Sequence, residues 1–210
     1  SLSDSLAPAF YITAPIDNYD ENTIYINSAS EYPDIYYFTT LAHEGYPGHL
    51  YQTVMSYNYG MAPFRSLLDY GGFTEGWATY VEMLSYYYAG LDEDVASFLQ
   101  HSEAATLSLY ASSDIGIHYH GWDRWQLYDF WKEYGFADED MIDRVRELIL
   151  ADPGNYLKYY VGYLEFEQLR EEKETEYGKK FDPVKFHKAI LKIGPAPFDI
   201  IDKYFEDYYK

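Results

Sequence analysis

Residues 43–49 read HEGYPGH and carry the strongest structural signal in the chain. A His-Glu pair followed within a turn or two by a second His is typical of a zinc hydrolase helix, in which two imidazoles bind Zn²⁺ and the Glu acts on a metal-bound water. The usual spacing, H-E-x-x-H, places both His on one helical face. Here His49 lies six residues after His43, so an unbroken helix would leave the two rings roughly 120° apart around its axis.

Pro47 and Gly48 supply the break that this spacing needs. Pro47 has no N–H to donate to the carbonyl of His43, and Gly48 can adopt a positive φ at little cost. We therefore expect a metal-binding helix with a two-residue bulge, which swings His49 back toward His43. The alternative is a proline-kinked helix in which His43 makes a hydrogen bond in the core and His49 lies on the surface.

A carboxylate on the next predicted helix offers a third ligand. In FTEGWATYVE, residues 73–82, Glu75 opens a helix on which apolar residues recur at helical spacing. A carboxylate in that position is either an N-terminal charge favoured by the helix dipole or a metal ligand. Because a Glu on a buried helix is rarely left unpaired, the pattern favours His43, His49 and Glu75 as ligands of one Zn²⁺.

Further motifs follow in an order that resembles a known bacterial family. DIGIH at residues 114–118 resembles a D-x-G-x-H segment, and Pro153-Gly154 followed by Tyr159 and Gly162 resembles a P-G-x-x-x-x-Y-x-x-G segment. Together with HEGYPGH and FTEGWA, these motifs resemble the family called domain of unknown function 885, from about Phe10 onward. Supporting matches in the C-terminal part are Leu169-Arg170, Phe181-Asp182, Phe186-His187 and Gly194 followed by Pro197.

That family is grouped with the gluzincin-type zinc metallopeptidases, whose metal ligands are two His and one Glu. The resemblance implies that His43, His49 and Glu75 hold one Zn²⁺, and that Glu44 is the general base that passes a proton from zinc-bound water to the leaving amine. Many members carry a further His after the motif, whereas Leu50 stands there in this chain, which leaves His49 as the ligand. The implied substrate is a short peptide, and carboxypeptidase and oligopeptidase action both stay open.

Other polar residues are candidates for the remaining roles in such a site. His118 and His120 form an H-x-H pair, which is a rival ligand set. The resemblance instead implies that His118 orients a metal ligand or contacts the transition state. The structural alternative is that His118 and His120 are half-buried residues near Asp114 and Asp123. Tyr159 and His118 are both candidate donors to the oxyanion that develops opposite the metal.

Arg170 allows two interpretations, and His187 has one expected role. Arg170 could bind a substrate carboxylate through a bidentate fork, which would favour carboxypeptidase action. It could equally be the buried ion-pair partner of Glu167 or Glu75. His187 follows Phe186 on an apolar helix and is expected to be a hydrogen-bonded core residue.

Two functions of other classes compete with hydrolysis of peptides. A non-catalytic peptide- or glycan-binding module that retains the fold would suit a chain with 27 tyrosines, but it has no use for the intact Glu44. A glycosidase using Glu75 and Glu82 would place its carboxylates seven residues apart on one helix, about 10.5 Å of rise, which exceeds the separation that such enzymes use.

Composition excludes several classes of partner. The formal net charge of −20 argues against nucleic acid and anionic membrane surfaces as partners. The absence of cysteine excludes disulfides and thiolate ligands and suits either the cytosol or a bacterial exterior. No run of apolar residues is long enough to cross a membrane, and the N-terminus does not have the pattern of a signal peptide. An export signal or lipid anchor would therefore lie outside this segment.

Strand-like segments precede helical ones. Apolar and β-branched runs at 9–14 and 23–27 flank a polar turn at 17–22, which predicts a hairpin; in gluzincin-type enzymes, such an edge strand pairs with extended substrate. Helical periodicity predicts helices at about 34–46, 48–58, 64–69, 74–89, 92–112, 120–134, 138–151, 156–177, 183–193 and 197–208.

We therefore expect a mainly α (α+β) fold with a small N-terminal hairpin. Residues 1–210 are predicted to form a single catalytic-type domain, strand-rich at 1–33 and helical at 34–210. Members of the resembling family are usually much longer, with a helical region before the motif. The chain thus resembles the C-terminal catalytic part of a longer protein, whose N-terminal region would help to complete the substrate cleft.

Overall fold

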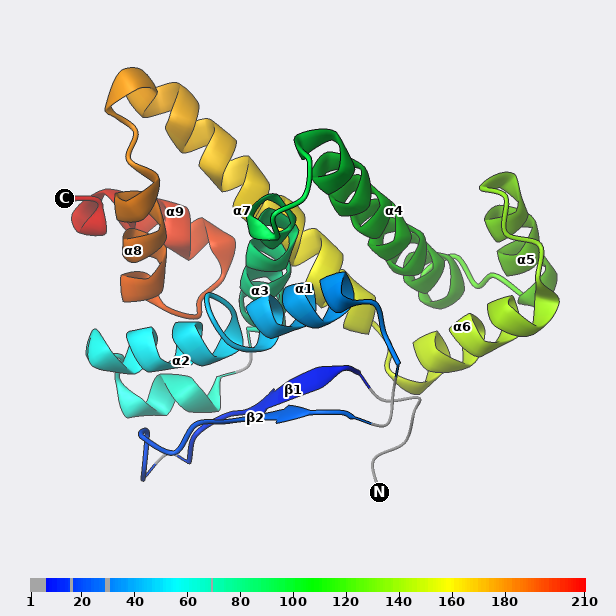
Figure 1. The fold of residues 1–210 in the computed structure, drawn as a ribbon, viewed down its shortest axis with the longest axis horizontal. Helices are drawn as coiled ribbons and strands as arrows, with labels where there is room; N and C mark the ends of the chain where they lie inside the picture. The colour runs from blue at the N-terminus through cyan, green and yellow to red at the C-terminus, as the bar shows by residue number, and fades with distance from the viewer. Residues whose placement is uncertain (1–6, 16, 29–30, 69) are drawn as a thin grey trace.

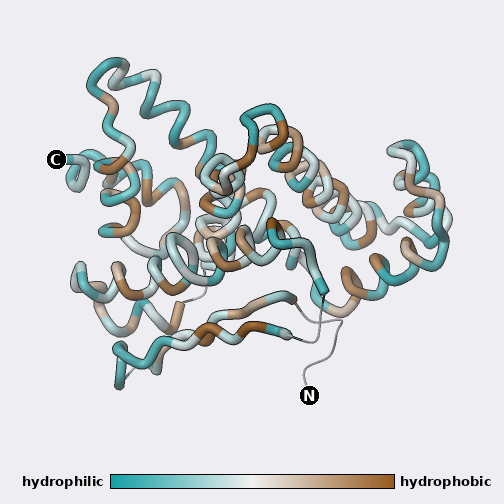
Figure 2. Tube along the Cα trace, in the orientation of Figure 1, coloured by the Kyte–Doolittle hydropathy of each residue, from teal (hydrophilic) through white to brown (hydrophobic). Residues whose placement is uncertain are grey.

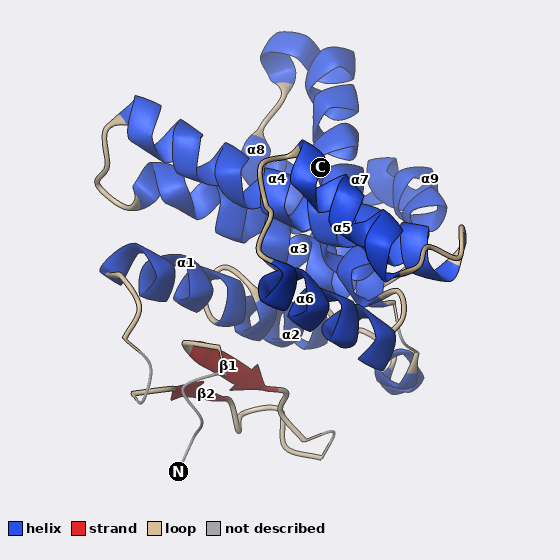
Figure 3. Ribbon diagram, turned by 90° about the vertical axis from the view of Figure 1, so that its right-hand side faces the viewer, coloured by secondary structure: helices blue, strands red, loops and turns tan. Residues whose placement is uncertain are grey.

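A short hairpin precedes a largely helical body, as expected (Figures 1 and 3). The structure is a computed structural model that describes residues 7–15, 17–28, 31–68 and 70–210. The antiparallel strands β1 (Ala9–Ile12) and β2 (Thr23–Ile26) pair with Ala9 opposite Ile26. The helices are α1 (Asp34–Glu44), α2 (His49–Asn58), α3 (Gly71–Ser85), α4 (Glu93–His118), α5 (Arg124–Glu133), α6 (Glu139–Ala151), α7 (Asn155–Tyr177), α8 (Pro183–Ile193) and α9 (Phe198–Tyr208), with 3₁₀ turns η1 (Pro63–Leu67), η2 (Tyr86–Tyr88) and η3 (Gly178–Lys180).

Most helix boundaries lie within a few residues of those expected. The helix expected at 64–69 is instead the 3₁₀ turn η1, and position 69 lies outside the described residues, as do residues 1–6, 16 and 29–30 of the strand-rich segment. The N-terminal end of α3 lies at Gly71, a turn earlier than expected, so Glu75 belongs to the second turn of that helix.

The prediction that α4 ends at 112 was wrong, because the helix continues to His118. A Cβ at Gly116 would collide with the indole of Trp122. This glycine therefore makes room for an aromatic ring that packs on the helix, and it requires no change of backbone direction.

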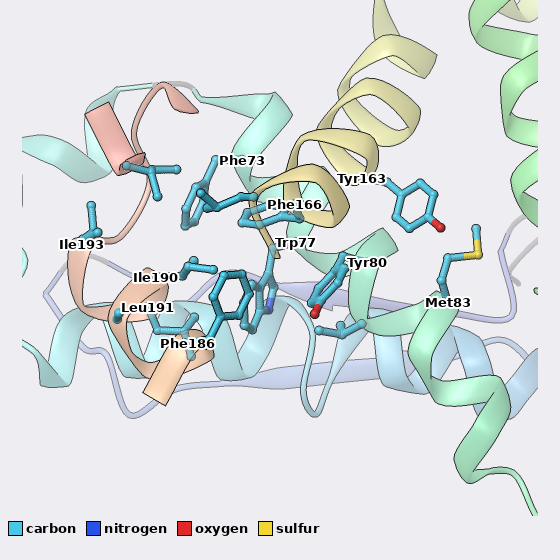
Figure 4. Close-up of a cluster of buried hydrophobic side chains, with 14 of the residues drawn as sticks. Phe73, Trp77, Tyr80, Met83, Tyr163, Phe166, Phe186, Ile190, Leu191 and Ile193 are labelled. Atoms are coloured by element: carbon cyan, nitrogen blue, oxygen red, sulfur yellow. The ribbon is translucent and has the colours of Figure 1, made fainter. Parts of the chain in front are cut away.

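Helix α3 lies at the centre of the main core. It places Phe73, Trp77 and Tyr80 in a cluster that Phe166 of α7 and Phe186 of α8 complete (Figure 4). Burial of such rings is the main stabilising contribution in a core of this kind. A second, smaller core joins α4, α5 and α6 at the far end of the molecule (Figure 1).

Helices α3 and α7 pack at unusually short range. A Cβ at Gly76 would lie 2.5 Å from the carbonyl carbon of Gly162, and one at Gly162 would overlap the carbonyl oxygen of Gly72. The two backbones can touch because both contact positions lack a side chain. Lys158 meets Gly71, and residues further along α7 meet later residues of α3, so the two helices run parallel.

The hairpin and the last turns of α7 mark two edges of the molecule. The hairpin lies along α1 and α2, and its tip is hydrophilic (Figures 1 and 2). The C-terminal half of α7 is also hydrophilic and ends before Gly178, where φ is +53° (Figure 2). Among the described residues, no helix is both long and apolar enough to span a membrane.

Candidate metal centre

The chain between His43 and His49 forms a loop between two helices. Helix α1 ends at Glu44 and α2 begins at His49, so the break lies where we expected it. The form that we predicted, one helix with a two-residue bulge, was wrong. The loop is closed by a hydrogen bond of 2.9 Å from the Gly48 amide to the carbonyl of Ala42.

Gly48 is required for a reason other than the one the sequence suggested. Its φ is −78°, so no positive φ is needed. A Cβ at this position would instead overlap the carbonyl group of His43. The loop folds back so tightly on α1 that only glycine fits, and this tight return brings His49 beside His43, with the ring centroids 4.8 Å apart.

The three expected ligands lie together. One ligand atom from each of His43, His49 and Glu75 lies within 4.8 Å of the other two. Glu75 Oε2 lies 3.3 Å from His49 Nε2 and 3.7 Å from His43 Nε2. Among the described residues, these three side chains form the one group of three or more His, Cys, Asp or Glu whose ligand atoms lie together.

Two details of this cluster fit a zinc ion. Glu75 Oε2 is buried and has no hydrogen-bond partner, which is costly for a carboxylate oxygen unless a cation is to bind there. On the other side of the ring, His43 Nδ1 lies 2.9 Å from Glu82 Oε2. An N–H at Nδ1 that donates to Glu82 leaves the lone pair of Nε2 facing Glu75, the arrangement of a carboxylate–histidine–zinc triad.

The short distances between these side chains shift their pKa values. Burial alone would lower the pKa of His43, but Glu75 and Glu82 outweigh burial and raise it to about 10. Burial alone would raise the pKa of Glu75, but His43 and His49 hold it far below its usual range. A proton on His43 and a divalent cation would compete for one position, because ligation requires the neutral ring.

Glu44, the expected general base, is held by the hairpin. Its Oε2 accepts a hydrogen bond of 2.8 Å from the backbone N–H of Tyr11 in β1. The charge of Glu44 also helps to raise the pKa of His43, its neighbour in the chain. The contact orients Glu44 from the strand side. The expected pairing of substrate with the same strand stays a prediction.

Tyr159 on α7 lies at the cluster. Its ring stacks on that of His43, with centroids 6.1 Å apart and planes inclined by 16°. Burial, the charge of Glu75 and a hydrogen bond with Glu75 all raise the pKa of Tyr159. The phenol therefore keeps its proton at neutral pH and can donate it in a hydrogen bond. The close approach of α7 at Gly162, one turn later, brings Tyr159 here.

His118 makes contacts of a structural kind. Its Nδ1 lies 2.8 Å from Asp114 Oδ1, one turn earlier on α4. Asp114 also accepts hydrogen bonds from the amide of Gly154, at 2.9 and 3.1 Å, where α7 begins. His120 is exposed, with its ring against Tyr119. In the part of the chain that the structure describes, the rival pair belongs to no ligand group. The alternative placed His118 near Asp114, which agrees with the observed contact, but both His118 and His120 are exposed and not half-buried.

Arg170 pairs with neither of the acids that we had named for it. Its Nε donates to Glu174 Oε1 at 2.7 Å, and its Nη1 donates to the Tyr80 hydroxyl at 3.2 Å. The predicted ion pair with Glu167 or Glu75 is therefore replaced by one with Glu174, one turn further along the same helix. Nothing in these contacts places Arg170 at the metal cluster, and a role in binding a substrate carboxylate stays a prediction.

Sequence analysis did not find two of the groups that support the cluster. Glu82 was weighed only as a glycosidase acid, and its partner His43 was not foreseen. The available signal was the seven-residue spacing from Glu75 on an apolar helix, which places both carboxylates on one face. The hydrogen bond from the Tyr11 amide could not be predicted from the sequence, because almost every residue has a backbone N–H.

Comparison with known proteins supports the family resemblance. Two solved structures resemble this chain, each of a protein described as a "putative lipoprotein". The one from Colwellia psychrerythraea has a TM-score of 0.80 and 27% identity over 98% of this chain and 36% of its own length. The one from Shewanella oneidensis, described as of unknown function, has a TM-score of 0.69 and 26% identity over 80% of this chain and 31% of its own length.

This chain therefore spans about a third of the length of these two proteins. No curated protein matches it. The family model described as "Bacterial protein of unknown function (DUF885)" matches residues 3–204. Because that match covers nearly the whole chain, the protein belongs to the DUF885 family.

Proposed function

We propose that this protein is a zinc-dependent hydrolase that cleaves peptide bonds in short peptides. One observation carries the proposal: the buried Glu75 Oε2 has no hydrogen-bond partner and faces the Nε2 atoms of His43 and His49. A carboxylate oxygen and two imidazole nitrogens, with no thiolate, suit Zn²⁺. Glu44 lies next to this ligand set in the chain, which is the position of the base in hydrolases of this type.

The residues divide the work as follows. His43, His49 and Glu75 would hold Zn²⁺, and Glu82 would keep the Nε2 lone pair of His43 directed at it. When bound, Zn²⁺ supplies a Lewis acid that makes water more acidic and polarises a carbonyl group. Glu44, oriented by Tyr11, takes the proton from the attacking water and returns it to the leaving amine.

Tyr159 would stabilise the transition state. Its phenol is buried beside Glu75, and its raised pKa keeps it protonated. A protonated phenol can donate a hydrogen bond to the oxyanion that forms when water attacks the carbonyl carbon. Because Tyr159 stacks on His43 but is not among the three ligands, its role is separable from metal binding.

The proposal also covers the size of the substrate and the location of the protein in the cell. The cluster and Tyr159 draw their side chains from four helices, α1, α2, α3 and α7, and such a helical enclosure favours short peptides over folded proteins. The two similar structures are of longer proteins described as lipoproteins, and we extend this to a lipid-anchored location in the bacterial envelope. The anchor and part of the cleft would then belong to regions outside this segment.

Replacement of Glu44 by Gln tests the mechanism. The variant keeps the shape of the side chain and its hydrogen bond from Tyr11, but removes the base. We expect one zinc per chain to remain and hydrolysis of a peptide library to fall by a factor of roughly 10² or more. Asp34→Asn, a carboxylate exchange at the far end of α1, is the matched control.

The outcomes separate the competing functions. Unchanged turnover in Glu44→Gln would contradict the mechanism. A different outcome is that the unsubstituted protein binds one zinc per chain and hydrolyses no peptide, even when assayed in its full-length form. That result would favour a peptide- or glycan-binding module that retains the fold.

A further inference from the structure

A second candidate site lies on the other side of α3 from the metal cluster. A cavity of about 560 Å³ opens between α1, α2, α3 and α8, and its walls include Phe38, Tyr46, Trp77 and His187. Trp77 follows Glu75 by two residues, so the two side chains leave α3 about 200° apart around its axis. The cavity and the metal cluster therefore use opposite faces of one helix.

The cavity has the size and lining of a small-molecule site. Sites for small ligands typically measure about 300–1,000 Å³ and combine apolar walls with a few fixed polar groups. Six of the fifteen lining residues are Phe, Tyr or Trp. At the mouth, Tyr46, Tyr88 and Val184 are 73%, 81% and 72% exposed, and a cluster of large exposed apolar side chains at a cavity is typical of a binding surface.

His187 gives the cavity one oriented hydrogen-bond donor. Its Nε2 lies 2.9 Å from the hydroxyl of Tyr80, and that oxygen already accepts a hydrogen bond from Arg170. Tyr80 is fully buried, so its hydroxyl proton needs an acceptor, and Nε2 provides one. The proton of the neutral His187 ring is therefore on Nδ1.

Nδ1 of His187 has no partner among the described residues and is not buried, so its N–H is available to a ligand. Burial and the positive charge of Arg170 lower the pKa of His187 to about 4. The ring is thus a neutral donor at physiological pH. The expectation of a hydrogen-bonded histidine in the core is correct for Nε2, but the ring also forms part of a cavity wall.

Charge indicates which ligands the cavity prefers. The chain has 35 acidic and 15 basic residues, yet Lys188 is present among the lining residues and no Asp or Glu is. A carboxylate would meet the His187 N–H and the Lys188 ammonium without a repelling neighbour in the wall. Charge-assisted hydrogen bonds of this kind are stronger than neutral ones.

We propose that this cavity binds a small monocarboxylate with an apolar body, such as a medium-chain fatty acid. The apolar body packs against Phe38, Tyr46 and Trp77, and the carboxylate accepts hydrogen bonds from His187 and Lys188. This site is separate from the metal cluster and does not depend on the proposed hydrolytic function. Trp77 connects the two regions, because its indole N–H donates to the carbonyl of Pro47 in the loop between the two His ligands.

Calorimetric titration with decanoate tests the proposal. We expect one decanoate to bind per chain, and decanol, which has the same apolar body without charge, to bind at least tenfold more weakly. Lys188→Gln should weaken decanoate binding roughly tenfold and leave decanol binding unchanged. Lys185→Gln on the same helix, which is absent from the cavity wall, is the matched control and should leave both affinities unchanged.

A second variant addresses the donor on His187. His187→Phe keeps a ring in the wall but removes the N–H, and it should weaken decanoate more than decanol. Lys188→Gln needs no core change, so it remains decisive if His187→Phe fails to fold. Equal affinities for decanoate and decanol, no effect of Lys188→Gln, or no decanoate binding in the full natural chain would each overturn the proposal.

Discussion

Two histidine–carboxylate clusters in this protein differ in whether each carboxylate oxygen has a hydrogen-bond partner. At His118, both carboxylate oxygens of Asp114 have partners, namely the imidazole and the Gly154 amide. At His43 and His49, a buried oxygen of Glu75 faces two ring nitrogens and has no hydrogen bond. A complete set of partners indicates a structural role, whereas a buried oxygen without one indicates a ligand yet to bind.

The largest contrast concerns metal content. His49→Ala removes one of three ligands, so we expect bound zinc to fall well below one per chain. His118→Ala changes the cluster in which every carboxylate oxygen has a partner, and it should leave zinc at one per chain. Emission spectrometry on both variants, after dialysis against one equivalent of Zn²⁺, measures the difference. Stoichiometric zinc in His49→Ala would make His118 and His120 the favoured ligands instead.

Tyr159 provides the next largest effect. Tyr159→Phe keeps the ring that stacks on His43 and removes only the hydroxyl. We expect kcat and kcat/KM to fall together, by on the order of 3 kcal/mol in transition-state stabilisation, with zinc content unchanged. Tyr160→Phe, the adjacent position on α7, is the control. Parent-like kinetics would assign Tyr159 to packing and leave His118 as the remaining candidate donor.

Glu82 should have a smaller effect, on affinity for the metal. Glu82→Gln keeps a hydrogen-bond acceptor for His43 Nδ1 but removes the negative charge. Changes in groups behind a metal ligand typically weaken metal binding by about 10–100-fold. Competition for zinc with a chromophoric chelator measures this loss. Glu103→Gln, which replaces another acid near Glu82, should change the affinity far less, and equal losses in both variants would point to net charge as the cause.

The smallest expected effect is on stability at the second cluster. His118→Ala removes one partner of Asp114 but leaves both hydrogen bonds from the Gly154 amide. We expect the free energy of unfolding to fall by about 1 kcal/mol, as measured by urea titration. Asp114→Ala should cost more, because it also leaves the Gly154 amide without its acceptor. Equal losses would show that the start of α7 does not depend on Asp114.

Much of the fold followed from local sequence patterns, because hydrophobic periodicity is a local property. The hairpin, α8 and α9 lie close to their expected positions. The cluster of His43, His49 and Glu75 was also accessible, since side chains that can bind zinc are few and their order in the chain was distinctive. What a local pattern could not reveal was contact between distant segments, such as Gly76 of α3 against Gly162 of α7.

The supporting contacts at the site were hidden for the same reason. The pairing of Glu82 with His43 depends on how α3 crosses α1, and that of Tyr11 with Glu44 depends on where the hairpin lies. The prediction that Gly48 is essential was correct, but the reason was wrong. A close backbone contact and a positive φ both require glycine, so the sequence alone cannot distinguish them. The cavity behind Trp77 involves four helices and has no sequence motif.

The parallel packing of α3 and α7 has a consequence for the order in which the protein is made. The three proposed ligands lie in α1, α2 and the start of α3, whereas Tyr159 follows only after α4, α5 and α6. Chains fold from the N-terminus as they are synthesised, and contacts between distant segments form late. Because Glu75 lies on α3, and α3 packs directly on α7, we expect the three proposed ligands to reach their final arrangement only after α7 has emerged, together with Tyr159.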